Sequence, residues 1–563
     1  MGRAVLTLVG LWAILSTLGA GVGLAIMHAV TTTRFSRTGD RLFWAWWLGV
    51  MLLAWLAFAA ALCVPVRSAM PVIVAIAAAA AVRGYWMARS ELRLMGAGTW
   101  WVLGVVACIV AERSVAIGNL EDTGGYHWSI IQWYEAFGIP PGLALFQWRL
   151  ATHSSWLALT AAMDLGSLEG RVATVGNGLL FAGCAWFFVL CAVRWIRGWA
   201  TLADRYAVFA LGFLLQQIAK WEMRASPSPD IPVLLGAAVV GWKMLADAEE
   251  VERTDGDALT VALFGAALVA VKLNAIPLAV VAAAYFLLRP TVELRAKAAG
   301  VAMLALVVAP VLVASWISTG CPLFPISLGC VDIPTGVGEA AARRYGDIIS
   351  TTARRDIGTG IAASLASLAL VLALRRSAPF AVRRRVAWPM LAWPMALAVA
   401  GMAFTAAIAP TMRFAAGYLV ILPALALAWI AGDARFALAE RVGRRVRVSV
   451  VLVLVAACAV PLYKEFIYQS LRERSFATWA ERKRGDPTIN AENSAWWLWP
   501  NRMAYAGPFQ TARAVDFDYA VSPPMTCWNH PQPCASNPPL GALPAVRLRD
   551  PARGLAGGFV HAR

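Results

Sequence analysis

The sequence predicts an all-α protein that crosses a membrane many times. Hydrophobic residues make up 60% of its 563 residues and charged residues only 14%. The mean hydropathy is +0.64, and apolar runs of roughly 15 to 25 residues, long enough to cross a bilayer as helices, recur along the chain. This composition excludes a soluble globular protein.

We count about fourteen such runs. The first is too long for the core of a signal peptide, so we expect it to remain as a span. The runs lie near residues 4–30, 42–64, 69–82, 98–118, 172–193, 206–220, 231–246, 258–272, 275–288, 298–318, 358–374, 387–409, 414–431 and 448–463.

The net charge of +17 could suggest a nucleic-acid partner, but the basic residues gather in alternate connectors between the runs. Examples are Arg34 and Arg37 after the first run, and Arg375 and Arg376 after the eleventh. Such alternation is the positive-inside pattern of membrane proteins. It predicts that the basic connectors are cytoplasmic, that the N-terminus is outside, and that no nucleic acid binds. The acidic connector 247–257 is the exception.

This orientation divides the chain into four parts: N-terminal spans in 1–118, an outer loop at 119–171, a transmembrane core at 172–463, and an outer tail at 464–563. The core includes a second outer loop, 319–357. Because the tail is polar and rich in Pro and Asn, we expect a small extracytoplasmic cap.

Four cysteines would then face an oxidising exterior, where disulfides persist. Cys527 and Cys534, in a Pro-rich part of the tail, are expected to pair. Cys321 and Cys330 are a second plausible pair. Free thiols are the alternative for both.

The outer loop 119–171 carries the polar run Glu121-Asp122-Thr123-Gly124-Gly125-Tyr126-His127. Paired carboxylates at the end of a span are a site hypothesis by default, because charge is costly there. A structural reading is also open, in which Asp122 only caps a short helix beginning near Thr123.

At this loop the chain resembles a family of bacterial multi-span proteins that looks like the GT-C class of integral-membrane glycosyltransferases. Thr411 and His153 depart from that family, which tends to have Asp and Asn there. The resemblance rests on the acidic run, Trp133, Pro141-Gly142-Leu143, Arg149, Ser154-Ser155-Trp156, Cys321-Pro322-Leu323-Phe324-Pro325, Pro410-Thr411-Met412-Arg413-Phe414, Cys527-Trp528 and Pro533-Cys534.

The resemblance implies a GT-C-like fold in the bacterial cytoplasmic membrane with its active face outside. It implies inverting transfer of a sugar from a polyprenyl-phosphate donor to a surface glycan, lipid or protein. A polysaccharide polymerase or ligase is one alternative. A lipid-linked glycan transporter is another, although it would carry more ionisable residues near the bilayer midplane and internal repeats.

Such a transfer needs a carboxylate to take the acceptor proton and cations to hold the leaving phosphate. We assign Asp122 as the base and give Glu121 an orienting or metal-binding role. Lys272, Arg413 and Arg149 are the candidate phosphate ligands, since arginine offers phosphate a fork and lysine a point charge. Lys272 could instead simply reach toward the membrane surface.

Aromatic and histidine side chains of the same loop are candidates for binding the sugar or acceptor: Tyr126, His127, Trp133 and His153. The aromatic residues could equally be anchors at the membrane interface. Asp122, His127 and His153 are acceptable ligands for a divalent metal. Their spacing is too loose to favour one, so we assign no metal and leave the cofactor open.

Overall fold

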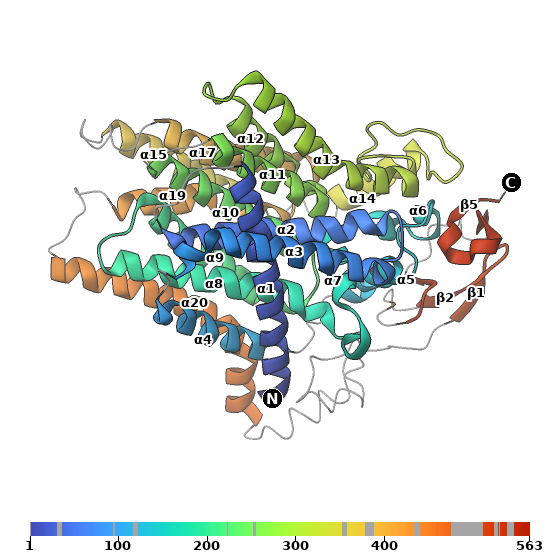
Figure 1. The fold of residues 1–563 in the computed structure, drawn as a ribbon, viewed down its shortest axis with the longest axis horizontal. Helices are drawn as coiled ribbons and strands as arrows, with labels where there is room; N and C mark the ends of the chain where they lie inside the picture. Colours follow the sequence, from blue (N-terminus) through green and yellow to red (C-terminus); the bar gives the residue numbers. More distant parts are fainter. Residues whose placement is uncertain are drawn as a thin grey trace.

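The computed structural model describes residues 2–30, 37–93, 96–115, 122–221, 223–250, 255–351, 357–377, 388–432, 440–473, 510–522, 527, 530–536 and 545–562. These residues form a large bundle of helices with a small β region at one end (Figure 1). The C-terminus lies in that β region.

Helices make up most of the described chain, and the strands all lie near its C-terminal end. The helices of the main bundle are α1 (Gly2–Val30), α2 (Thr38–Ala61), α3 (Val66–Leu92), α4 (Ala97–Ser114), α8 (Val175–Ile196), α9 (Leu202–Lys220), α10 (Asp230–Glu249), α11 (Asp255–Val271), α12 (Ile276–Leu287), α13 (Leu294–Thr319), α15 (Gly358–Arg376), α17 (Trp388–Ile408), α18 (Met412–Leu419), α19 (Ile421–Ile430) and α20 (Glu440–Glu473). The remaining elements are η1 (Thr123–His127), α5 (Trp128–Ala136), α6 (Leu143–Phe146), η2 (Trp148–Ala151), α7 (Ser155–Met163), η3 (Gly166–Leu168), η4 (Val172–Thr174), η5 (Met223–Ala225), η6 (Leu273–Ala275), α14 (Glu339–Thr351), β1 (Gln510–Arg513), β2 (Asp518–Ser522), β3 (Cys534–Ser536), β4 (Val546–Leu548), η10 (Pro551–Gly557) and β5 (Phe559–His561).

Within the described residues, 10 helices are long and apolar enough to cross a membrane, judged by length and composition. A multi-pass membrane protein is therefore the class that the structure supports. In the part of the chain that the structure describes, each of the fourteen apolar runs of the sequence overlaps a helix, and the run 414–431 covers two, α18 and α19. Those outside the group of 10 correspond to α4, α9, α11 and α12, so a count of fourteen crossings stays a prediction.

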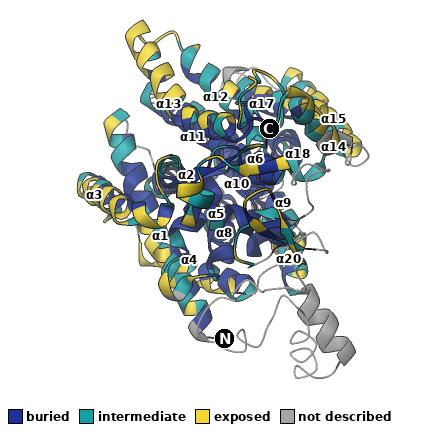
Figure 2. Ribbon diagram, turned by 90° about the vertical axis from the view of Figure 1, so that its right-hand side faces the viewer, coloured by how far each residue is buried: buried dark blue, intermediate teal, exposed yellow. Residues whose placement is uncertain are grey.

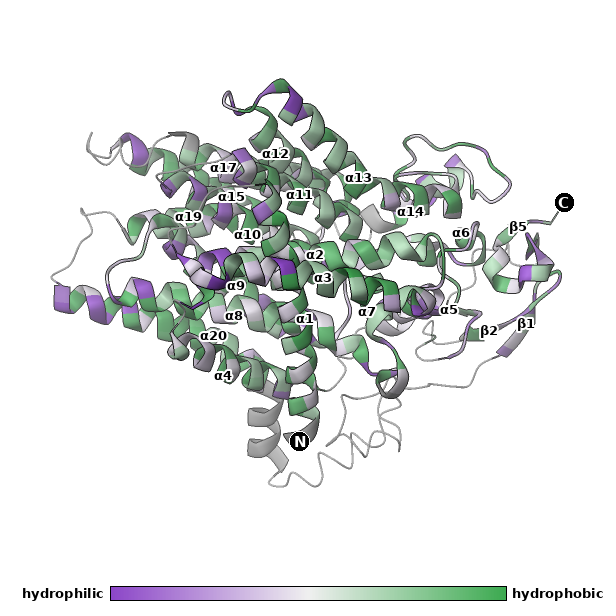
Figure 3. Cartoon of the chain, viewed as in Figure 1, coloured by the Kyte–Doolittle hydropathy of each residue, from purple (hydrophilic) through white to green (hydrophobic). Residues whose placement is uncertain are grey.

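Large apolar side chains cover the outward faces of the peripheral helices. Leu306 and Val313 on α13, and Leu452 and Val453 on α20, are all exposed. Figure 2 shows exposed residues along α13 and α3, and Figure 3 shows that these helices are mostly hydrophobic. Extended exposed apolar surface is rare on soluble proteins and suits contact with lipid.

Helix α1 crosses α2 and α3 where glycines allow backbone contact (Figure 1). A Cβ on Gly49 would lie 1.7 Å from the carbonyl oxygen of Gly19, and one on Gly23 would lie 1.8 Å from that of Ala45. In lipid, helices associate mainly through close packing, and small residues at the interface permit it. These glycines therefore fix where α1 meets α2.

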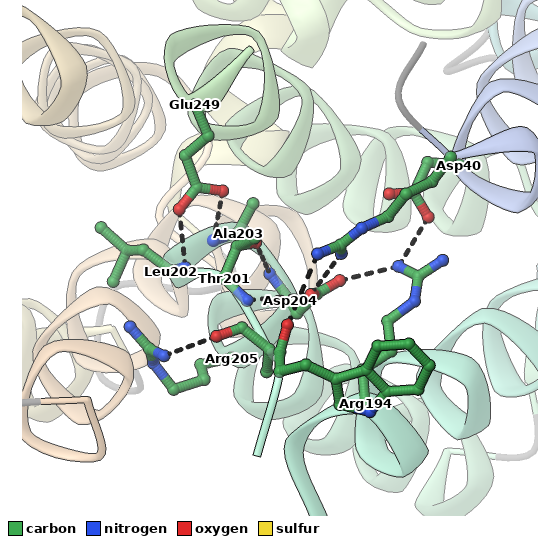
Figure 4. Close-up of polar contacts among 11 residues, drawn as sticks. Asp40, Arg194, Thr201, Leu202, Ala203, Asp204, Arg205 and Glu249 are labelled. Carbon is green, nitrogen blue, oxygen red and sulfur yellow. Dashed lines mark hydrogen bonds and ion pairs between the residues drawn. The ribbon is translucent and has the colours of Figure 1, made fainter. Parts of the chain in front are cut away.

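A charged network joins the ends of α2, α8 and α9 (Figure 4). Arg194 contacts Asp40 at 2.7 Å and Asp204 at 2.8 Å, and Arg37 contacts Asp204 at 2.5 Å. Asp204 also completes a capping box with Thr201 at the start of α9. These carboxylates thus hold helix ends together, and the sequence predicts that this end of the bundle is cytoplasmic.

The acidic connector that departs from the positive-inside pattern also has structural partners. The side chain of Glu249 accepts hydrogen bonds from the backbone N–H groups of Leu202 and Ala203, as Figure 4 shows. Asp247 and Asp257 both pair with Lys243, whose side chain is fully buried. Carboxylates in this connector therefore neutralise a buried cation and cap a helix, which accounts for the exception.

The tail folds onto the outer loop at the opposite end of the bundle. Strands β1 and β2 pair antiparallel and β2 and β3 pair parallel, while β4 and β5 form a separate antiparallel pair. Phe559 on β5 stacks on Phe146 at 5.6 Å, and its backbone N–H donates to the carbonyl of Pro141. Disulfides join the cysteine pairs Cys321–Cys330 and Cys527–Cys534.

The substitution Gly49→Val should destabilise the bundle, because the added side chain would collide with the α1 backbone. Overpacking typically costs about 1–3 kcal/mol, so we expect a clearly lower unfolding temperature in detergent. The matched control is Gly10→Val on α1, where an added Cβ meets no atom within 4 Å. Equal unfolding temperatures for the two variants would contradict the backbone contact.

Candidate functional site

Four charged side chains from separate elements form one ion-pair cluster, Asp122–Arg413–Asp230–Lys272. Arg413 contacts Asp122 through Nη2 at 2.8 Å and Asp230 through Nε at 2.9 Å. Lys272 pairs with the other oxygen of Asp230. The sequence predicted Asp122, Lys272 and Arg413 as site residues, and the structure brings these three together.

Asp230 is the member of the cluster that the sequence analysis missed. Its side chain is only 1% exposed, whereas those of Lys272, Asp122 and Arg413 are 24%, 27% and 36% exposed. A buried carboxylate must be paired, and two cations provide this. One feature of the sequence could have identified Asp230. It is an aspartate at the start of an apolar run, on the same predicted side as the outer loops.

Close helix packing places Arg413 beside Asp230. Arg413 lies in the first turn of α18, and Thr411 caps that helix by accepting a hydrogen bond from the backbone N–H of Phe414. A Cβ on Gly417 would lie 2.5 Å from the carbonyl oxygen of Leu234 on α10. The missing side chain thus lets α18 approach α10. Threonine is a good residue for such a cap.

Asn177 on α8 organises the turn that leads into Asp230. Its side-chain amide donates to the carbonyls of Met223 and Ser226 at 3.2 and 2.6 Å, and to that of Ser228 at 2.9 Å. The indole N–H of Trp156 donates to its carbonyl oxygen at 2.9 Å. The hydroxyl of Ser226 in turn meets Thr123 in η1 at 2.7 Å. The turn before Asp230 and the segment after Asp122 are therefore held together.

Asp122 precedes η1, but its side chain makes no capping hydrogen bond to that turn. Burial raises the pKa of Asp122, but His127, which is protonated only at low pH, and the Arg413 guanidinium both lower it, and the net shift is downward. Its carboxylate is therefore ionised at neutral pH. Glu121, the other predicted carboxylate, lies outside the described residues.

Tyr126 and His127 lie near Asp122, and Arg149 lies beside Tyr126. Burial lowers the pKa of His127 to about 4, with Asp122 opposing the shift, so its imidazole is neutral at pH 7. Within the described part of the chain, Nδ1 of this buried histidine has no hydrogen-bond partner. The guanidinium of Arg149 lies 5.6 Å from the ring centre of Tyr126, and none of the described ion pairs joins it to the cluster.

Trp133 and His153, which the sequence analysis assigned to sugar or acceptor binding, are buried and have hydrogen-bond partners within the protein. Trp133 is fully buried, and its indole N–H donates to Gln532 at 3.1 Å. The two ring nitrogens of His153 meet the hydroxyls of Tyr134 at 3.1 Å and Ser318 at 2.9 Å. Both residues thus join the outer loop to other elements, and we do not carry them into the proposed site.

The cluster combines a partly exposed carboxylate with two partly exposed cations. The carboxylate can accept a proton, and the cations can hold an anionic group. Both cations also face the ring of Phe414, with Lys272 at 4.1 Å and Arg413 at 5.2 Å from its centre. In the described ranges no group of three or more His, Cys, Asp or Glu side chains could hold a metal ion, so we place none here.

We expect Asp230→Ala to lower the free energy of unfolding by up to about 3 kcal/mol, the low end for breaking a buried ion pair, because both cations retain some contact with water. Asp122→Ala should cost no more than about 1 kcal/mol, as for a partly exposed pair. Denaturant titration in detergent measures both. A smaller loss for Asp230→Ala than for Asp122→Ala would contradict the assignment of Asp230 as the anchor.

The comparisons with known proteins identify a family. No curated protein and no solved structure matches the chain. Residues 5–359 match a family described as "Domain of unknown function (DUF8201)". This match covers more than half of the chain and includes Asp122, Asp230 and Lys272. The chain therefore belongs to the family defined by the DUF8201 domain.

Proposed function

We propose that this protein is an integral-membrane glycosyltransferase of about fourteen spans. It moves a sugar from a polyprenyl-phosphate donor to an acceptor on the extracytoplasmic side of a bacterial cytoplasmic membrane. The observation that carries the proposal is the ion-pair cluster. It combines an ionised, partly exposed carboxylate with a guanidinium and an ammonium at one end of apolar helices.

In the proposed step, Asp122 accepts the proton of an acceptor hydroxyl. The acceptor oxygen forms a bond to the anomeric carbon of the sugar while the bond from that carbon to the phosphate oxygen breaks. The electron pair of the broken bond stays on the phosphate, whose growing negative charge faces Arg413 and Lys272. Cations arranged before the reaction stabilise such a charge without reorganising. Attack opposite the leaving group inverts the anomeric centre.

The sidedness of the cluster supports this proposal. Asp230 begins α10, whereas Glu249 of the opposite charged network ends it, so about 30 Å of helix separates the two ends. The positive-inside pattern assigns the network end to the cytoplasm. The cluster end carries the outer loop, the folded tail and two disulfides, which suit an oxidising exterior.

Loss of the protein should remove a sugar from the cell's surface glycans, and mass spectrometry of those glycans with and without the chain tests this. When cells that lack the protein are given the Asp122→Asn variant, the glycan should stay incomplete. Transfer should be reduced at least about a hundredfold, the usual scale for losing a positioned general base. The control is Asp518→Asn, the same change in an exposed outer ion pair with Arg513. Normal glycans made by a well-expressed Asp122→Asn protein would remove Asp122 from catalysis.

A tag placed after Arg563 should be reached by a membrane-impermeant reagent added to intact cells, because the folded tail shares the side of the cluster. A tag inserted between Arg376 and Trp388, in a basic connector, should be reached only after the membrane is opened. The reverse pattern would turn the cluster toward the cytoplasm and end the proposal of an extracytoplasmic active face.

A further inference from the structure

The guanidinium of Arg413 is shared between two carboxylates in very different surroundings. Its Nε contacts Asp230 and its Nη2 contacts Asp122. The Asp230 side chain is 1% exposed, whereas that of Asp122 is 27% exposed. Because separate nitrogens serve the two carboxylates, Arg413 can lose the outer one while it keeps the inner one.

Asp230 is held in place by several partners, whereas Asp122 is held by fewer. Asp230 also binds Lys272 and lies at 3.3 Å from the hydroxyl of Ser228. Among the described contacts of Asp122, Arg413 is its one ion-pair partner, and the Asp122 side chain caps no helix. Releasing Asp122 would therefore break one partly exposed pair, whereas releasing Asp230 would leave a buried charge.

We propose that the donor phosphate exchanges with Asp122 for Nη2 of Arg413, so that binding of the donor frees the catalytic base. This inference rests on the proposed function. It names a compulsory order in which the donor binds before the acceptor is deprotonated. Asp230 then acts as a positioning residue that holds Arg413 and Lys272 during the exchange.

Charge and geometry both favour the exchange. Each of the two cations already has a carboxylate partner in the free cluster, so an incoming phosphate must compete with a carboxylate for a cation. Phosphate suits the fork of an arginine as well as a carboxylate does. While Asp122 is paired, Arg413 depresses the pKa of its carboxyl, which makes it a weaker base. When the donor has arrived and Asp122 has lost Arg413 as a partner, the basicity of Asp122 is restored.

Binding of undecaprenyl phosphate to the purified full-length protein in nanodiscs tests the exchange. If Asp122 competes with phosphate for Arg413, Asp122→Asn should bind this lipid about two- to fivefold more tightly than the native protein, the scale of a partly exposed ion pair. Arg413→Met should bind it about tenfold or more weakly, because a charged hydrogen-bond donor is lost. Asp518→Asn should bind like the native protein.

Two controls keep the outcomes separate. Unfolding temperatures establish that each variant is folded, and Asp122→Ala should tighten binding as Asp122→Asn does. If folded Asp122 variants bind the lipid equally or more weakly while sugar transfer is lost, the exchange is overturned and the glycosyltransferase proposal stands. If neither the native protein nor any variant binds the lipid, the donor class itself fails, and the exchange fails with it.

Discussion

A buried carboxylate in an apolar bundle needs positive partners, and this requirement organises the candidate site. Asp230 begins α10 with almost no contact with water. Lys272 follows the end of α11, and Arg413 lies at the start of α18. Because the cost of an unpaired buried charge is several kilocalories per mole, these helix ends are stable only when they converge. The position of Asp122 at the cluster depends on that convergence.

The two ends of the bundle use ion pairs differently. At the end shown in Figure 4, Asp204 completes a helix cap and Glu249 accepts bonds from the backbone of α9. Those carboxylates join helices, and structural partners satisfy their charge. At the opposite end, Asp122 caps nothing and is partly exposed. This difference, rather than the number of charges, is the reason that we propose the cluster as the place for chemistry.

Glycines determine how precisely the helices meet. In lipid the hydrophobic effect does not draw apolar helices together, so close contacts decide their positions. Gly417 lets α18 touch the backbone of α10, and this contact brings Arg413 to Asp230. The proposed exchange at Arg413 requires such a rigid base, because the guanidinium must stay in place when one of its two carboxylates leaves.

The sequence by itself determined the class of fold, the positions of the apolar helices and most of the cluster. Length and hydropathy suffice for the helices because each span satisfies its own backbone within the lipid. Asp122, Lys272 and Arg413 were predictable because charges at the ends of apolar runs are costly and are rarely present without a role. Tertiary structure alone decided that they meet, since their pairing depends on contacts between helices distant in the chain. It also added Asp230, placed Trp133 and His153 in other hydrogen-bond networks, and gave the acidic connector a structural role. Burial and partners are properties of the packed bundle, and no local pattern in the sequence encodes them.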